Sequence, residues 1–191
     1  MSRTATAAIL AAFLTAAVAG CGRDPVSYDD PGSTTVSRDF SDTDIRASAG
    51  ELGASLAKAP VISEARNRPK ILALRIKNRT DRRIKTSIII SQIETRLLGT
   101  GKVEFIDGAA RPELAREYAY MASGNVNPSE AKGPGGQAGA DYVLHGTVEN
   151  VPVRQGKEKV DYYYIKLTLV DVIRGTKTWQ GEKEIKKRIR R

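Results

Sequence analysis

Apolar side chains recur at helical spacing in two stretches of the chain. The stretch 41–59 predicts a first helix, because its apolar residues stand three or four positions apart and Pro60 follows it. Those apolar residues are Ile45, Ala49, Leu52 and Leu56. The stretch 84–98 predicts a second helix from its length and position, although its three consecutive isoleucines would favour a strand in isolation.

Short apolar runs bounded by charged residues predict the first two strands. The run 70–77 is strongly apolar between lysines, which is typical of a buried central strand. Asn78–Asp81 follows it as a polar turn. Glycines and a threonine at 99–101 end the second helix, and the alternating run 102–107 predicts the second strand.

The middle of the chain carries a third helical signal and then a loop. Pro112 fits the first turn of a helix, and Leu114, Tyr118 and Met121 are expected to mark its inner face. The stretch 123–139 is rich in glycine and proline, and therefore predicts a surface loop with at most one helical turn.

Three further strands are predicted in the C-terminal third. They cover 141–150, 160–172 and 177–185, with a polar turn at 151–157, so that they form an antiparallel meander. Residues 186–191 are expected to form a frayed basic tail.

Alternation along the second of these strands separates its two faces. The predicted core face carries Tyr163, Ile165, Leu167 and Leu169. Tyr162 and Tyr164 then share the opposite face with Lys166 and Thr168, where a helix could cover them or a partner could reach them.

The order of the predicted elements defines the fold class. Helix, strand, helix, strand, helix and three strands predict an α/β (α+β) fold with a mixed parallel and antiparallel sheet flanked by helices. We expect a single domain over 41–187 and a flexible tether over 21–40, which is rich in glycine, proline, serine, threonine and aspartate. A basic tail is expected at 188–191.

The N-terminus predicts export and lipidation. Arg3 precedes a short apolar run that is too short for a membrane span and of the right size for a secretory signal over residues 1–20. The run ends in Val-Ala-Gly-Cys, which resembles the bacterial lipobox, so we expect Cys21 to be diacylated and to anchor the chain. Gly22 follows the cysteine and, by analogy with enteric sorting, permits placement in the outer membrane, facing the periplasm.

Charge and residue usage narrow the function classes. The formal net charge is +9, which favours anionic partners without choosing among them, and a soluble protein with many exposed lysines explains it equally well. A single cysteine rules out a disulfide within the chain, and a single histidine argues against a metal site. Export argues against nucleic acid as a partner, and no pattern points to a cofactor or a small-molecule substrate.

Three motifs that could suggest catalysis have simpler explanations. His145 lies in a predicted strand without a second histidine or a serine elbow, so we interpret it as a structural or surface residue. Gly99–Lys102 lacks the remaining residues of a phosphate-binding loop and leads into a strand. Glu113 and Glu117 stand four residues apart beside Arg116, as on a solvated helix face. We therefore predict no enzyme and no catalytic residue.

The order and spacing of several short segments resemble the LpoB family, over residues 41–187 and the lipobox. The segments are Asn78-Arg79-Thr80 with Ile84-Lys85-Thr86, Asp141–Leu144 with Gly146, and a closing group of Tyr164, Leu167, Leu169, Asp171, Gly175 and Trp179. The resemblance implies a fold related to the N-terminal domain of TolB. It also implies a lipoprotein activator that crosses the peptidoglycan meshwork, binds a noncatalytic docking domain of a class A penicillin-binding protein, and stimulates glycan polymerisation and crosslinking without chemistry of its own.

Three functional readings stay open at this point. In the first, an activator of cell-wall synthesis contacts the synthase through the loop at 124–136 and through a turn comprising Asn78, Arg79, Thr80, Arg82 and Arg83. In the second, a basic periplasmic module holds anionic wall polymer or lipid through Lys183, Lys186, Lys187, Arg188, Arg190 and Arg191. In the third, the chain is a lipoprotein component of a secretion assembly, which would form stable homo-oligomers.

Overall fold

A computed structural model describes residues 29–35, 37, 39–155 and 158–189. The chain divides into two compact units, Met1–Ser33 and Thr34–Arg191, and the second unit contains all the helices and strands described below. The predicted signal peptide and Cys21 lie outside the described residues.

Helix α1 spans Asp42–Ala57 and confirms the first predicted helix. Ser41 precedes it as the N-cap, and the Ser41 backbone N–H donates to the Asp44 carboxylate at 2.6 Å. Its buried side includes Ala49, Leu52 and Leu56, as the helical spacing predicted. The short helix α2, Pro60–Ser63, begins at the proline that follows.

The predicted strand at 70–77 is two short strands, β1 (Lys70–Ala73) and β2 (Lys77–Asn78). Both strands pair in parallel with β4. Ala73 lies opposite Leu144 and Lys77 lies opposite Thr147, so the four residue steps from Ala73 to Lys77 run beside only three steps of β4. This extra residue is a bulge, which interrupts the pairing between the two strands. The prediction of a single strand over 70–77 was therefore wrong, because an apolar run does not show where one strand has an extra residue relative to its neighbour.

Helix α3, Thr86–Gly99, and strand β3, Glu104–Ile106, confirm the next two predictions. Ile89, Ile93 and Leu97 are buried on α3, while Ile88 is largely exposed. Gly101 has φ +67, a conformation that glycine adopts at little cost just past the end of a helix.

Helix α4, Arg111–Tyr120, continues into the π-helical turn η1, Met121–Asn125. Neither element has a buried residue, and 40% of Leu114 is exposed. Of the expected inner face, Tyr118 and Met121 are half-buried and accept hydrogen bonds from Gln137 and Lys132, whereas the prediction is wrong for Leu114. Helical spacing shows which side of a helix is apolar, but it does not show that a surface lies within reach.

The antiparallel meander is confirmed, with strands longer than expected: β4 is Tyr142–Gln155, β5 is Glu158–Asp171 and β6 is Lys177–Ile189. The turn predicted at 151–157 is wrong for 151–155, which pairs with β5. Likewise, 186–189 pairs with β5 where a frayed tail was expected. Hydrogen bonds to a neighbouring strand hold these polar segments in the strand conformation, and the local sequence pattern does not indicate such pairing.

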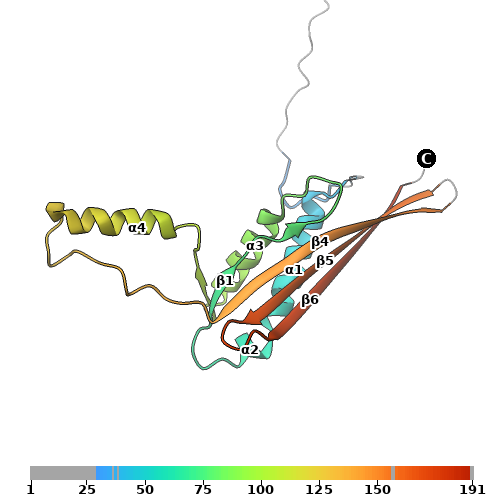
Figure 1. Cartoon of the computed structure of the whole chain (residues 1–191). Helices are drawn as coiled ribbons and strands as arrows, with labels where there is room; N and C mark the ends of the chain where they lie inside the picture. Colours follow the sequence, from blue (N-terminus) through green and yellow to red (C-terminus); the bar gives the residue numbers. More distant parts are fainter. Residues whose placement is uncertain (1–28, 36, 38, 156–157, 190–191) are drawn as a thin grey trace, which may run out of the picture. The chain divides into compact units, whose positions relative to one another are not determined.

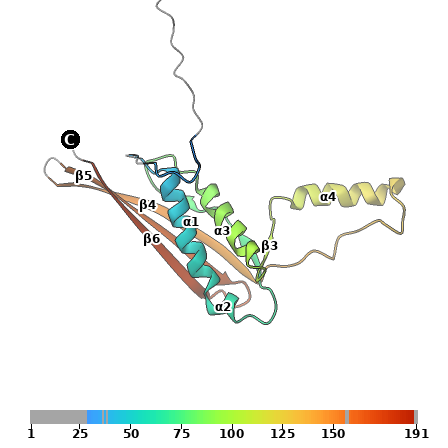
Figure 2. The same ribbon diagram turned by 180° about the vertical axis from the view of Figure 1, so that it is seen from behind.

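The sheet has the order β3-β1-β4-β5-β6, with β2 paired to β4, and it mixes parallel and antiparallel pairs as predicted. Helices α1 and α3 both pack on one face (Figures 1 and 2). The core between helices and sheet includes Ile71, Leu144, Val148 and the predicted β5 group of Tyr163, Ile165, Leu167 and Leu169. Phe40 packs edge-on against Tyr163 at 5.3 Å between ring centroids.

Candidate partner-binding surface

The face of the sheet opposite α1 and α3, which we call the open face, carries a row of polar side chains. Strand alternation turns His145, Thr147 and Glu149 of β4 to this face, while Leu144 and Val148 point into the core. Register places His145 opposite Thr168, Thr147 opposite Lys166, and Glu149 opposite Tyr164.

A groove of about 420 Å³ lies where the open face meets the bulge between β1 and β2. Its cationic side chains outnumber its single carboxylate, Glu149, which pairs with Arg79 at 3.3 Å. The cations are Arg75, Lys77, Arg79, Lys166 and Lys177. A concave surface lined by one sign of charge attracts ligands of the opposite sign, so this cationic groove suits an acidic partner.

The turn after β2 is held by its own hydrogen bonds. Asn78 Oδ1 accepts from the Thr80 backbone N–H at 3.0 Å and from Thr80 Oγ1 at 2.7 Å. Asn78 Nδ2 donates to the Arg82 carbonyl at 2.7 Å. The side chains of Asn78 and Thr80 therefore shape the turn.

The arginines of the same turn point in different directions. Arg79 lines the cationic groove, whereas Arg82 pairs with Asp39 at 3.1 Å and Asp81 at 3.7 Å. Arg83 is exposed. Of the five residues expected to touch a partner, Arg79 joins the groove, Arg83 is exposed and lines a separate hollow with Asp39 and Phe40, and the other three stabilise the turn.

Tyrosines and glutamates pair across the open face of β5 and β6. A hydrogen bond to Glu182 raises the pKa of Tyr164 to about 12. The same bond lowers the pKa of the Glu182 carboxyl, which also accepts from Gln180 at 2.9 Å. Burial, and then a hydrogen bond to Glu184, raise the pKa of Tyr162. The Glu182 carboxylate is thus held ionised.

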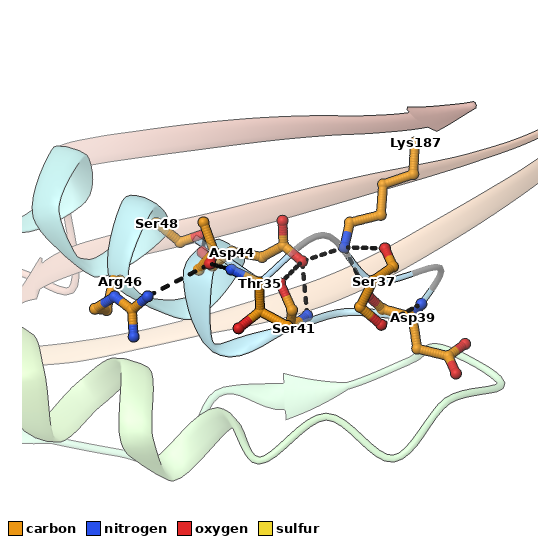
Figure 3. Close-up of polar contacts among 9 residues, drawn as sticks. Thr35, Ser37, Asp39, Ser41, Asp44, Arg46, Ser48 and Lys187 are labelled. Atoms are coloured by element: carbon orange, nitrogen blue, oxygen red, sulfur yellow. Dashed lines mark hydrogen bonds and ion pairs between the residues drawn. The ribbon is translucent and has the colours of Figure 1, made fainter. Parts of the chain in front are cut away.

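Two lysines expected on a basic binding surface face α1 instead. Lys183 pairs with Glu51, and Lys187 pairs with Asp44. Lys187 Nζ also donates to the carbonyls of Ser37 at 3.2 Å and Asp39 at 2.6 Å (Figure 3). These lysines join β6 to the helix layer, while Arg190 and Arg191 lie outside the described residues.

The described part of the chain contains no group of three or more histidine, cysteine and acidic residues that could hold a metal ion. His145 is exposed and lines the cationic groove, in agreement with a surface role. Within the same described ranges, no helix has the length and apolar character needed to cross a membrane.

Sequence reasoning missed most of the cationic groove. Strand parity had already placed Lys166 on the face away from the core, but it could not connect that face with Arg75, Lys77 and Lys177. Arg75 stands inside the apolar run at 70–77, and the bulge turns it outward. Only the pairing of distant strands brings these charges together.

The chain thus has an α/β domain in which helices cover one face of a mixed sheet and the other face carries charged side chains. The family described as "Peptidoglycan-synthase activator LpoB" matches residues 44–185, and the chain belongs to this family. Membership gives it the general role of the family, which is regulatory: these periplasm-facing lipoproteins act with penicillin-binding proteins to activate peptidoglycan synthesis.

Solved structures resemble the chain at low sequence identity. The LpoB C-terminal domain from Salmonella enterica is 15% identical, covers 74% of this chain and 98% of its own, and has a TM-score of 0.45. The domain from Escherichia coli is 16% identical, with coverages of 72% and 97% and a TM-score of 0.44. Lipoprotein GNA1162 from Neisseria meningitidis is 21% identical, with coverages of 63% and 83% and a TM-score of 0.40. A search of curated proteins found no match.

Proposed function

We propose that this chain binds a class A penicillin-binding protein and stimulates its synthesis of peptidoglycan. The observation that carries the proposal is the family match over 44–185, which covers nearly all of the packed domain.

The cationic groove is the proposed contact, together with the adjoining turn at 78–83. Lys77, Lys166 and Lys177 carry charges that no ion pair among the described residues neutralises. An acidic patch on a noncatalytic domain of the synthase would complement them, and complementary charge steers association and fixes orientation. The loop at 124–136 stays a second proposed contact.

The membrane anchor is part of the same proposal. A diacylated Cys21 in the outer membrane would present the domain to the periplasm, where the synthase works. Replacing Cys21 with serine should release the protein from the membrane fraction and remove the lipid mass from the mature chain. Retention of the variant in membranes would contradict the anchor and leave the family membership intact.

A charge-reversal pair tests the groove. Lys77→Glu with Lys177→Glu reverses two exposed groove residues, and Arg66→Glu with Lys102→Glu makes the same change in net charge at exposed positions outside both proposed contacts. The groove variant should lose at least about tenfold in affinity for the synthase, because charged contacts at such interfaces are worth more than 1.4 kcal/mol together. It should also lose stimulation of glycan polymerisation, while the control keeps both.

The same variants separate the proposal from its alternative, a module for anionic wall polymer or lipid, which the groove's charge also favours. That module would bind isolated peptidoglycan or anionic vesicles without the synthase, and the binding would disappear in high salt because exposed charges are screened. Equal stimulation by the groove variant and the control would remove the groove from the mechanism.

A further inference from the structure

Strand β6 forms one edge of the sheet. It is 13 residues long, and within the described ranges no strand pairs with its outer side. An unpaired edge presents a row of backbone N–H and C=O groups to any chain that can align with it. One way in which proteins prevent such pairing is to place charged side chains, especially lysines, along the edge.

The charges along this edge are separated by sign instead. On the open face, Glu182 and Glu184 precede Ile185, while Lys186 and Arg188 follow it, and these four charged side chains are all exposed. If two copies of β6 pair antiparallel with the two-fold axis at Ile185, Glu184 of each copy faces Lys186 of the other. Glu182 likewise faces Arg188, so opposite charges meet at all four of these positions.

Neighbouring registers lack this match. In a symmetric antiparallel pair the axis must pass through a residue, because side chains directly opposite each other point to the same face. An axis at Glu184 or Lys186 sets that residue against its own copy. An axis at Lys183 sets Glu182 against Glu184, and an axis at Lys187 sets Lys186 against Arg188. Like charges directly opposite destabilise a pair, and among the axes at 183–187 only the one at Ile185 avoids them on the open face.

The helix-facing side of β6 is compatible with the same register. Ile185 is half-buried and would meet its own copy, which adds an apolar contact at the axis. Lys183 would stand opposite Lys187, but each lysine is already paired within its own chain, with Glu51 and Asp44 respectively. Their charges are therefore compensated before the copies meet.

We propose that two copies of this chain associate through antiparallel pairing of β6 centred on Ile185, which makes one continuous sheet across the dimer. Because the axis is perpendicular to the sheet, both open faces point the same way. The dimer would present two cationic grooves on one side. This inference does not depend on the identity of the groove's partner.

Two charge variants of the full chain test the register. Each also carries Cys21→Ser, so that association through a lipid anchor does not contribute. Lys186→Glu with Arg188→Glu makes the face wholly acidic, and Glu182→Lys with Glu184→Lys makes it wholly basic. Sedimentation velocity should show that each variant alone has a dimer dissociation constant at least tenfold above that of the parent. An equimolar mixture should recover the dimer, because each acidic strand can pair with a basic one.

An oxidative crosslink provides a second measurement that does not require loss of binding. Ile185→Cys in the Cys21→Ser chain should form an intermolecular disulfide readily, because paired Cα atoms at the axis lie about 4.5–5.5 Å apart. Gln180→Cys should not, because its opposite residue is 190. A parent chain that stays monomeric, a mixture that fails to recover the dimer, or equal crosslinking at both positions would overturn the proposal.

Discussion

Replacing Lys187 with methionine should destabilise the domain, because this lysine joins three acceptors at the junction of β6 and α1. Its Nζ pairs with the Asp44 carboxylate and donates to the Ser37 and Asp39 carbonyls (Figure 3). Only 14% of the Lys187 side chain and 13% of the Asp44 side chain are exposed. Methionine keeps the length and the apolar stem and removes only the charge and its donors.

The expected loss of stability depends on the interactions that the Asp44 carboxylate retains when Lys187 is replaced. Breaking a buried ion pair by removing one partner costs about 3–5 kcal/mol, since the other charge is left uncompensated. Asp44 retains hydrogen bonds from the Ser41 N–H at 2.6 Å and Oγ at 2.9 Å, and it lies in the first turn of α1, where the helix dipole favours a carboxylate. We therefore expect Lys187→Met to lower the free energy of unfolding by about 2–3 kcal/mol.

Urea denaturation followed by circular dichroism measures this loss as a shift in midpoint at constant slope. Lys183→Met is the matched control, because it makes the same change on the same strand face. Its partner Glu51 is 59% exposed, so it should cost no more than about 1 kcal/mol. In the variant Lys187→Met with Asp44→Asn, much of the lost stability should be recovered, since position 44 no longer carries an uncompensated charge. Equal costs for the two lysines would refute this reasoning.

Two further predictions concern the sheet and α3. Gly146→Ala should destabilise the domain by about 1–3 kcal/mol or more in urea, because its Cβ would lie 2.2 Å from the Lys166 carbonyl oxygen; an unchanged midpoint would contradict this packing. Burial, and then the Asp107 charge, raise the pKa of the Glu94 carboxyl. The folded state therefore binds the carboxyl proton more tightly than the unfolded state, and the domain loses stability as pH rises above 4.5. Glu94→Gln should therefore be more stable than the parent at pH 7 and lose that advantage near pH 4, whereas an equal difference at both pH values would disprove the assignment.

Elements that a pattern among neighbouring residues marks could be predicted from the sequence. Helix α1 and the core face of β5 followed from spacing, because burial against one layer imposes a period of 3.6 or 2 on the apolar residues, whereas α3 followed from the length and position of its segment. The mixed sheet followed from the order of these elements. The family resemblance rested on the same segments, and the match over 44–185 confirms it.

Features that depend on contacts between distant segments were missed or misplaced. The exposed face of α4 shows that an apolar stripe does not guarantee a packing surface, and 151–155 became strand only by pairing with β5. The alternative of a basic binding surface included Lys183 and Lys187, yet α1 supplies carboxylates for both. A charge shows its partner only when the chain is folded.

The sequence by itself determined the helices of the packed layer, the alternation of the long strands, the excess of positive charge and the family. The tertiary structure alone decided where those charges act. The bulge after Ala73 turns Arg75 outward, and strand pairing sets Lys166 and Lys177 beside it to form the cationic groove. The physical reason is that the spacing of apolar residues depends on neighbours in the sequence, whereas a groove is formed by strands that meet only after the chain has folded.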